Sequence, residues 1–320
     1  MAITIRLYEH KMKQQVTALF SKQYGVAEET FSKLLDHFYD HPYQKDKSIR
    51  IVAVDGDKVV GFQSFFYWPY YYQDKELRVF QSGNSLVHPG YRGQQIFARL
   101  LGFLDEHRAQ LKIDLLIGFP IAASINSLVR NGWQHTLDLQ WYVCRGSALS
   151  LCSSEQKQLD KCFTSFSTKP ISDNSSDYIR LSSDADFVKW RSDYSTGQPY
   201  RYFRYESKDG ITEFTLKPSR RKRIIRELVI GDIRSTSYDP HHLSSALREL
   251  VAEVRKHRTS TIISFAANPH NTAISRDVLN NAGFRSIRRT VFFCMKNFSA
   301  PKEFQQPEKW MLYRSDIDTW

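Results

Sequence analysis

The chain has 320 residues, of which 41% are hydrophobic and 25% are charged, and this balance excludes a disordered polyelectrolyte. At roughly 100–200 residues per domain, the length predicts about two domains. The formal net charge of +11 favours polyanionic partners such as nucleotide phosphates, a nucleic acid or an anionic membrane surface, although a basic surface without any specific partner explains it equally well.

Targeting and metal-binding signals are absent from the sequence. The N-terminus, Met1 to Arg6, lacks the apolar stretch of a signal peptide, and no apolar run reaches the roughly 18 residues of a membrane span. We therefore expect a cytoplasmic protein. None of the four cysteines forms a C-x-x-C pair or has a histidine at metal-ligand spacing, so we expect reduced thiols and no metal site; they are Cys144, Cys152, Cys162 and Cys294.

Apolar spacing in the first half predicts alternating strands and helices. In chain order these are a strand at 3–8, helices at 10–24 and 29–39, strands at 49–55, 58–67 and 77–87, a helix with apolar residues at 96, 100, 101 and 104, a strand at 115–119, a short helix, and a strand at 137–145. Asp55-Gly56 predicts a hairpin turn, and Gly132 is typical of the residue that ends a helix.

The second half shows a similar succession after a Ser-rich stretch. It predicts a helix at 186–194, strands at 201–207, 212–216 and 223–230, a helix after Asp239-Pro240, a strand at 261–266, a short helix, and a strand at 290–295. We interpret 1–146 as one domain, 147–178 as a linker with one possible strand, 179–298 as a second domain and 299–320 as a tail.

Two matched positions indicate that the halves arose by duplication. His88-Pro89 corresponds to Asp239-Pro240, and Gly132-Trp133 corresponds to Gly283-Phe284. Both pairs are 151 residues apart, since 239 − 88 and 283 − 132 give the same offset. Two unrelated α/β halves remain the alternative explanation.

The element order and the segment from Val87 to Phe97 resemble the GNAT acyltransferase superfamily. That segment contains His-Pro-Gly-Tyr-Arg-Gly-Gln-Gln and is similar to the Arg/Gln-x-x-Gly-x-Gly/Ala coenzyme A signature of the family. The resemblance implies an α/β (α+β) fold of two tandem GNAT domains, each a mixed, mostly antiparallel central sheet flanked by helices. It also suggests a tandem group associated with bacterial surface-polysaccharide gene clusters.

The resemblance implies that acetyl-CoA or another acyl-CoA binds at this turn, with no metal. A helix N-terminus presents unpaired N–H groups and a favourable dipole to an anion such as the pyrophosphate. The implied coenzyme contacts are Leu86, Val87, Arg92, Gly93, Gln94, Gln95, Ile96 and Phe97. Gln95 stands where the family has Gly; if its φ is positive, it costs roughly 1–2 kcal/mol relative to Gly.

Catalytic groups are less clear in the sequence. Many GNAT enzymes have a Tyr acid in the helix after the fifth strand, where this chain has Leu128, and an Asn near Ile121. The remaining candidates are Asn84, which could orient the acceptor, His88, whose pKa suits a base, and Tyr142, which could face the thiol. For His88 a role at the helix entry, and for Tyr142 a role in the core, are the simpler explanations.

An aromatic run predicts where the acceptor binds. Exposed rings with polar tips stack well on sugars or bases, and the candidates are Trp68, Tyr70, Tyr71 and Tyr72. Packing between domains is the alternative. A second aromatic set, in the second half, is a further candidate for the same cleft; it comprises Trp190, Tyr194, Tyr200, Tyr202 and Tyr205, with Arg191 beside it.

The leading functional hypothesis is N-acyl transfer from acetyl-CoA to a small-molecule amine, such as an amino sugar. The second half lacks glycine or arginine in phase after Asp239-Pro240, so we interpret it as a degenerate copy that shapes the acceptor pocket; a ligand site of its own is the alternative. The basic run from Lys217 to Arg223 keeps a transferase with an aminoacyl-tRNA or lipid-linked acceptor open, although a nucleic-acid partner is not the favoured one. A non-catalytic acyl-CoA-binding module is the third hypothesis.

Overall fold

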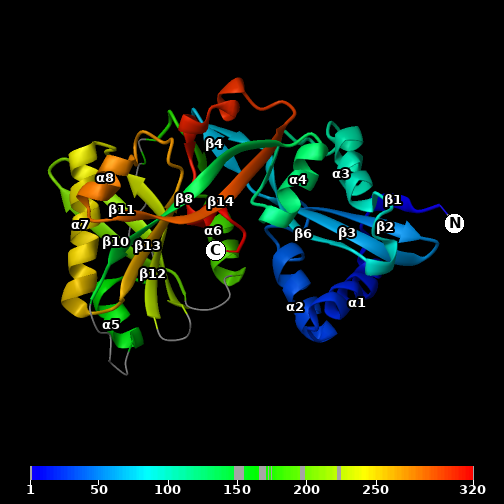
Figure 1. Ribbon diagram of the computed structural model, residues 1–320, viewed down its shortest axis with the longest axis horizontal. Coiled ribbons are helices and arrows are strands. Elements are labelled where there is room, and N and C mark those ends of the chain that lie inside the picture. Colours follow the sequence, from blue (N-terminus) through cyan, green and yellow to red (C-terminus); the bar gives the residue numbers. More distant parts are fainter. Residues whose placement is uncertain are drawn as a thin grey trace.

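The computed structural model describes residues 2–147, 155–165, 171, 173, 175–194, 199–221 and 225–319. Within these ranges the chain forms an α/β structure in which two helix-flanked halves share one large sheet (Figure 1). Cys152, Lys222 and Arg223, which the sequence analysis singled out, lie outside the described residues. No helix in the described part of the chain is long and apolar enough to cross a membrane.

The first half contains the predicted elements and two further short strands, at 70–72 and 75–77, between the strands predicted at 58–67 and 77–87. They are β1 (Thr4–Leu7), α1 (Lys13–Tyr24), α2 (Glu28–Tyr39), β2 (Ile49–Asp55), β3 (Lys58–Tyr67), β4 (Tyr70–Tyr72), β5 (Lys75–Leu77), β6 (Val79–Val87), α3 (Ile96–His107), β7 (Leu115–Gly118), α4 (Ala122–Arg130) and β8 (Gln134–Arg145). Side chains alternate across a strand, so neighbours on β3 face different helices: Gly61 lies against Ile96 of α3, and Phe62 packs on Phe20 of α1. The sheet is thus covered by α1 and α2 on one face and α3 on the other.

The second half contains the predicted elements in their order, together with a short helix at 155–162 and short strands at 179–181 and 310–311. Its elements are α5 (Glu155–Cys162), β9 (Ile179–Leu181), α6 (Ala185–Tyr194), β10 (Arg201–Ser207), β11 (Gly210–Arg221), β12 (Ile225–Ser235), α7 (Pro240–His257), β13 (Ile262–Ala267), α8 (Arg276–Asn281), β14 (Arg285–Asn297) and β15 (Trp310–Met311). The segment expected to be a linker with one possible strand contains the helix α5, which packs against α7. The described residues 155–162 are therefore part of the folded second half.

The two halves exchange their last strands. The eleven-stranded sheet has the order β1-β2-β3-β6-β7-β14-β8-β13-β12-β11-β10, so β14 pairs with β7 of the first half and β8 pairs with β13 of the second. Figure 1 shows β8 and β14 crossing side by side between the halves. Read from either edge, the sheet has antiparallel strands, then a parallel pair (β6–β7 or β12–β13), then the last strand of the opposite half.

This exchange distributes the core residues of β8 between two hydrophobic clusters. Leu137 and Leu139 belong to the cluster of the first half, whereas Tyr142 and Cys144 belong to that of the second. The first cluster also contains Phe293 of β14. Because each half is completed by a strand from the other, the halves fold onto a shared core, even though 1–146 and 179–298 remain the predicted sequence units.

The C-terminal segment fastens the two halves together. β15 joins a four-stranded sheet of order β15-β9-β4-β5, which contains strands from both halves. Beyond it, the hydroxyl of Tyr70 donates to Asp316 Oδ1 at 2.6 Å, and Gln81 of β6 donates to the Asp316 carbonyl at 2.7 Å. Burial raises the pKa of Asp316 to about 7.

Candidate acyl-coenzyme site

The parallel strands β6 and β7 separate part of the way along β6. They pair from Val79–Leu115 to Gln81–Ile117, after which β7 ends at Gly118 while β6 continues to Val87. From Ser82 onward the β6 edge therefore has no ladder with β7 among the described residues. Such an edge presents N–H and C=O groups to which an extended, amide-containing ligand can add as a strand does.

A bulge in β6 marks the point of separation. Phe65 of β3 pairs with Ser82 and Gln63 pairs with Ser85, so Gly83 and Asn84 together oppose Ser64. The bulge needs a glycine, because a Cβ on Gly83 would lie 2.7 Å from the Phe66 ring. The extra residue changes which way the Asn84 side chain points.

Asn84 belongs to a small buried network. The hydroxyl of Tyr39 donates to Asn84 Oδ1 at 2.5 Å and lies 2.5 Å from Ser64 Oγ. Ser64 Oγ in turn donates to the Asn84 carbonyl at 3.2 Å. Because Tyr39 is fully buried, burial raises its pKa, so its hydroxyl stays protonated and keeps the Asn84 amide in one orientation. Sequence patterns did not reveal Tyr39 or Ser64, since the spacing of Tyr39 is that of an ordinary core residue.

The turn that follows β6 is built from polar and glycine residues. A short 3-10 helix, Pro89–Tyr91, begins at His88, and Tyr91 donates to Asp55 Oδ2 at 2.9 Å. Gly93 has a φ of 82°, which glycine adopts without strain. Arg92 is exposed on this turn, and it donates to the Val87 carbonyl at 3.4 Å and to Gln23 at 3.2 Å.

The backbone of Gln95 is left-handed, which is the case in which Gln is strained relative to Gly. Its φ is 57° and its ψ is 20°, and it serves as the N-cap residue of α3 without a side-chain cap. Its carbonyl accepts the first helical bond, from Arg99 N–H at 3.0 Å. The substitution of Gln for Gly therefore carries a backbone strain of roughly 1–2 kcal/mol.

The start of α3 combines open donors with positive charge. Without a side-chain cap on Gln95, the first-turn N–H groups of α3 are available to a ligand, and the helix dipole favours an anion there. The pKa of His88 is lowered, first by partial burial of its ring and then by the positive charges of Lys58, Lys22 and Arg92. An uncapped 12-residue helix thus begins just after the turn that carries Arg92, at the end of the open β6 edge.

The corresponding junction in the second half is closed. There Asp239 is itself the N-cap of α7, and its carboxylate accepts from His241 N–H at 2.9 Å and His242 N–H at 3.0 Å. The helix begins at Pro240, with no intervening turn. A carboxylate already occupies the place where an anionic ligand would bind.

The gap between β12 and β13 is filled by the C-terminal segment. Tyr313 forms an antiparallel bridge with Ala267, and its ring packs against Phe265 at a centroid distance of 5.4 Å. Asn268 N–H donates to the Leu312 carbonyl at 3.1 Å. Tyr313 is 2% exposed. Among the described residues, no isolated bridge of this kind is formed with β6 or β7.

The structure brings only one of the three predicted catalytic residues to the bulge, namely Asn84. His88 lies at the other end of the β6 edge, where its Nδ1 accepts from Gly90 N–H at 3.2 Å, so it stabilises the turn. Tyr142 pairs with Phe265 in the second-half cluster, because β8 crosses into that half, and burial raises its pKa. The expectation that Tyr142 faces the thiol is therefore corrected.

The positions at which the family has an acid and an asparagine remain apolar in space. Leu128 is 5% exposed and packs in the core, and Ile121, at the N-cap of α4, is 72% exposed. Neither side chain can donate a proton. The described residues near the bulge offer hydroxyls and amides, namely Tyr39, Ser64, Ser82 and Asn84.

The expectation that the aromatic run binds the acceptor is wrong for three of its four rings. Trp68 and Tyr70 are fully buried and Tyr72 is 8% exposed, because β4 lies inside the small sheet between the halves. Trp68 packs on Trp190 of α6 at a centroid distance of 5.6 Å. Only Tyr71 is partly exposed, and its hydroxyl donates to Glu76.

A pocket of about 570 Å³ lies instead on the second-half side of α6. Its lining combines aromatic rings with charged and hydroxyl groups; it includes Phe187, Arg191, Tyr200, Tyr202, Glu213 and Thr215. The same helix reaches the bulge, since Trp190 packs on Phe66, whose ring lies against Gly83. The predicted second-half residues Arg191, Tyr200 and Tyr202 therefore line a cavity on one side of α6, and Trp190 of the same helix packs toward the bulge.

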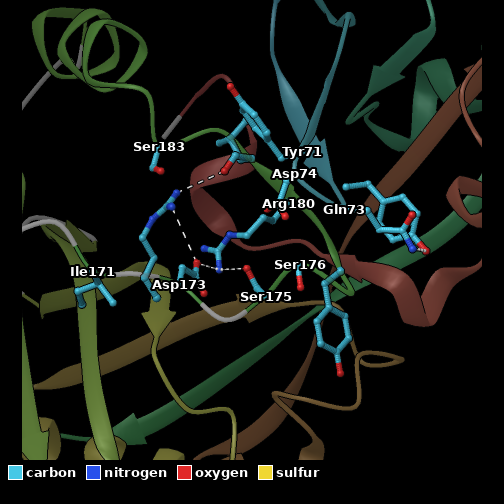
Figure 2. A pocket seen from close by; sticks show the side chains of 13 residues that line it. Tyr71, Gln73, Asp74, Ile171, Asp173, Ser175, Ser176, Arg180 and Ser183 are labelled. Atoms are coloured by element: carbon cyan, nitrogen blue, oxygen red, sulfur yellow. Dashed lines mark hydrogen bonds and ion pairs between the residues drawn. The ribbon is translucent and has the colours of Figure 1, made fainter.

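A smaller polar pocket of about 240 Å³ contains a dense ion-pair network (Figure 2). Arg180 of β9 pairs with Asp173 and Asp232 and donates to Ser175 Oγ at 3.1 Å. These contacts satisfy the charges within the protein. The pocket is thus a polar junction between β9 and β12, and the larger pocket beside α6 is the better candidate for a substrate.

Residues 4–136 match the sequence model of the Acetyltransferase (GNAT) domain family. The matched residues are those of the first half, which contains the turn at Arg92 and Gly93. The whole chain is also similar in fold to solved GCN5-related N-acetyltransferases, from Anabaena variabilis ATCC 29413 (12% identity, TM-score 0.60, covering 92% of this chain and 73% of that one) and from Kribbella flavida (13%, 0.58, 94% and 73%).

A third structure with this fold is a fungal GCN5-related glucosamine N-acetyltransferase region of a multi-domain protein (12% identity, TM-score 0.51, covering 92% of this chain and 38% of that one). No curated protein matches the sequence. At these identities the solved structures show a similarity of fold alone, and the family match relates residues 4–136 to GNAT acetyltransferase domains.

Proposed function

We propose that the chain is an N-acyltransferase that binds acyl-CoA in its GNAT domain. The pyrophosphate would contact the N-terminus of α3 and Arg92, and the pantetheine arm would lie along the open β6 edge. The observation that carries the proposal is the uncapped start of α3 at the end of the β6 edge that has separated from β7. Backbone donors and nearby cations are what a pyrophosphate requires.

The acyl group would lie at the Gly83–Asn84 bulge. Because Tyr39 holds Asn84 Oδ1, the Asn84 amide nitrogen is directed away from that hydrogen bond. It can donate to the acyl carbonyl, whose oxygen gains negative charge when an amine attacks. An amide is not a base, so Asn84 is a positioning and charge-stabilising group. The partly exposed hydroxyl of Ser82 is a group at the bulge that can relay the amine proton to solvent.

The acceptor would be a small-molecule amine that binds in the pocket beside α6. Tyr200 and Tyr202 offer rings with polar tips, and Glu213 offers a carboxylate that attracts a protonated amine. Such a lining suits an amino sugar, which is also the acceptor class named for the fungal structural neighbour. The same lining supports a small molecule over a nucleic acid, because it mixes acidic and basic groups.

An acetyl-CoA turnover assay tests this function. The full-length chain should release free thiol from acetyl-CoA in the presence of at least one amino sugar or related amine. Asn84→Ala should lower kcat by about 100-fold if its amide stabilises the developing charge. Asn281→Ala, a change of the same type at an exposed position, is the matched control and should retain full activity.

Absence of turnover with a broad panel of amines, together with tight acyl-CoA binding, would contradict the catalytic assignment and support a binding module. Equal losses in the Asn84 and Asn281 variants would contradict the role of Asn84. A kcat that falls only in Asn84→Ala, with KM for acetyl-CoA unchanged, is the expected result.

A further inference from the structure

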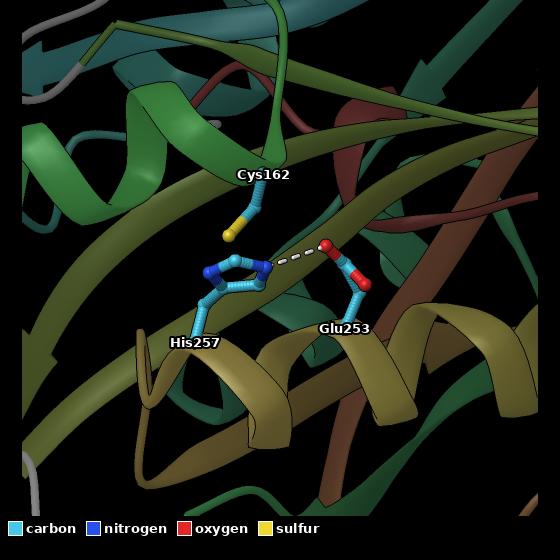
Figure 3. Close-up of side chains that lie close together, drawn as sticks. All are labelled: Cys162, Glu253 and His257. Atoms are coloured by element: carbon cyan, nitrogen blue, oxygen red, sulfur yellow. Dashed lines mark ion pairs between the residues drawn. The ribbon is translucent and has the colours of Figure 1, made fainter.

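A side-chain cluster far from the coenzyme site contains three different metal-ligand types. Cys162 ends α5, and Glu253 and His257 lie one turn apart on α7 (Figure 3). One donor atom from each residue lies within 4.8 Å of the other two, and Glu253 Oε1 is 2.9 Å from His257 Nε2. Sequence spacing hid this cluster, because Cys162 and His257 are 95 residues apart (257 − 162).

We propose that Cys162, Glu253 and His257 bind one Zn²⁺ ion and leave a fourth position to water. Thiolate sulfur, imidazole nitrogen and carboxylate oxygen are the ligands that zinc prefers, in tetrahedral geometry. Bond lengths of about 2.0–2.3 Å place such ligand atoms within about 4 Å of one another, so shifts of roughly 1 Å would complete the site.

The helices α5 and α7, which supply the ligands, are each anchored in the core by buried side chains. Leu159 and Phe163, on either side of Cys162, are 1% and 3% exposed and belong to the second-half core. Glu253 and His257 share one face of α7, an 18-residue helix whose Leu250 and Val254 are buried in the same core. Binding would therefore require little reorganisation of the backbone.

Charge at the cluster also favours a cation. Thiolate and carboxylate together carry two negative charges, which match a divalent ion, and α7 ends at His257, so its dipole contributes negative potential there. In the protein alone, burial and Glu253 raise the pKa of Cys162 to about 11. Metal binding would release the thiol proton to solvent and form the Zn–S bond.

The ion would serve to tie α5 to α7. On β10, Arg201 forms an ion pair with Asp160 of α5. A metal that binds the folded state alone adds stability by mass action. Because the cluster does not belong to the proposed coenzyme site, zinc binding and acyl transfer can be tested separately.

Zinc titration of the full-length chain tests the proposal. Protein freed of metal with a chelator should take up one equivalent of Zn²⁺ in competition with a chromophoric chelator, and Co²⁺ should produce a sulfur-to-cobalt charge-transfer band. Cys162→Ser and His257→Gln should each weaken binding by more than about 100-fold, beyond the roughly 10–100-fold of outer-shell changes. His270→Gln, at an exposed position, is the matched control and should bind as the unmodified chain does.

Thermal unfolding of each metal-free variant shows whether it is folded. If Cys162→Ser does not fold, Glu253→Gln and the cobalt band provide the same test. Zinc uptake that is lost in the ligand variants alone supports the site. Binding that is absent, or equally strong in the ligand variants and in His270→Gln, would overturn it.

Discussion

The two strand–helix junctions of this chain start from similar sequences and end in opposite electrostatic states. After His88-Pro89, a turn of several residues leads to α3, whose N-cap residue Gln95 makes no side-chain cap. After Asp239, α7 begins at once, and the Asp239 carboxylate binds its first N–H groups. Whether a helix N-terminus can receive an anion thus depends on whether the protein has already supplied one.

The strand pairs beside these junctions differ in the same sense. β6 leaves β7 after Gln81 and keeps an open edge, whereas the separation of β12 and β13 holds Tyr313. The first half is therefore arranged to receive a ligand, and the second uses its own C-terminal segment for packing. Each of the following changes should affect one side of this comparison and leave the other intact.

The largest effect is expected at the inserted tyrosine. Tyr313→Ala should lower the free energy of unfolding by roughly 3–5 kcal/mol, because it removes a large buried ring that packs on Phe265. Tyr313→Phe keeps the ring and is the matched control. Denaturant titration measures both, and a loss below about 1 kcal/mol for Tyr313→Ala would show that the insertion is not part of the core.

The buried Asp316 should make stability depend on pH. Its pKa is raised to about 7 in the folded state, so the protonated carboxyl is favoured there; the stability is full below the unfolded value near pH 4 and falls as the pH rises to about 7. Between about pH 5 and pH 8 the unfolding free energy should fall by roughly 2–3 kcal/mol more in the unmodified chain than in Asp316→Asn. Equal pH slopes in the two proteins would contradict this account.

Replacement of Gln95 should separate strain from binding. Gln95→Gly removes the positive-φ strain at the start of α3 and should raise the unfolding free energy by roughly 1 kcal/mol. Arg258→Gly, at the left-handed C-cap of α7, is the matched control and should give a similar gain. Coenzyme affinity should be retained in both variants; a loss of affinity confined to Gln95→Gly would mean that its side chain contacts the ligand.

A change of similar size is expected at the closed junction. Asp239→Ala should lower the unfolding free energy by about 0.5–2 kcal/mol, since the cap of α7 is lost. It should not create a second coenzyme site, because Tyr313 still fills the neighbouring gap. Calorimetry of coenzyme A binding to this variant checks the point, and a second equivalent bound would refute it.

Local patterns predicted most elements but not their partners. The spacing of apolar residues and the turn at Asp55-Gly56 placed the strands and helices of the first half within a few residues. Periodicity identifies the buried face of a strand, not the strand beside it. The exchange of β8 and β14 therefore could not be predicted, and with it the location of Tyr142.

Only the local part of the candidate site could be predicted from the sequence. The turn at Arg92-Gly93 is visible in the sequence, because its residue types and order are local. The aromatic residues Trp68 and Tyr70 were misassigned, since their burial depends on α6 and on the C-terminal segment, which are more than 100 residues away in sequence. Tyr39, the partner of Asn84, was missed because a hydrogen bond between distant elements leaves no pattern.

The stoichiometry of coenzyme A binding tests most directly the claim that this chain has a single acyl-coenzyme site, at the start of α3. Isothermal titration of the full-length chain should give one equivalent, and Arg92→Glu should abolish the binding heat without changing the thermal unfolding, because it reverses a charge on an exposed turn. Two equivalents, or an unchanged affinity in folded Arg92→Glu, would contradict the account.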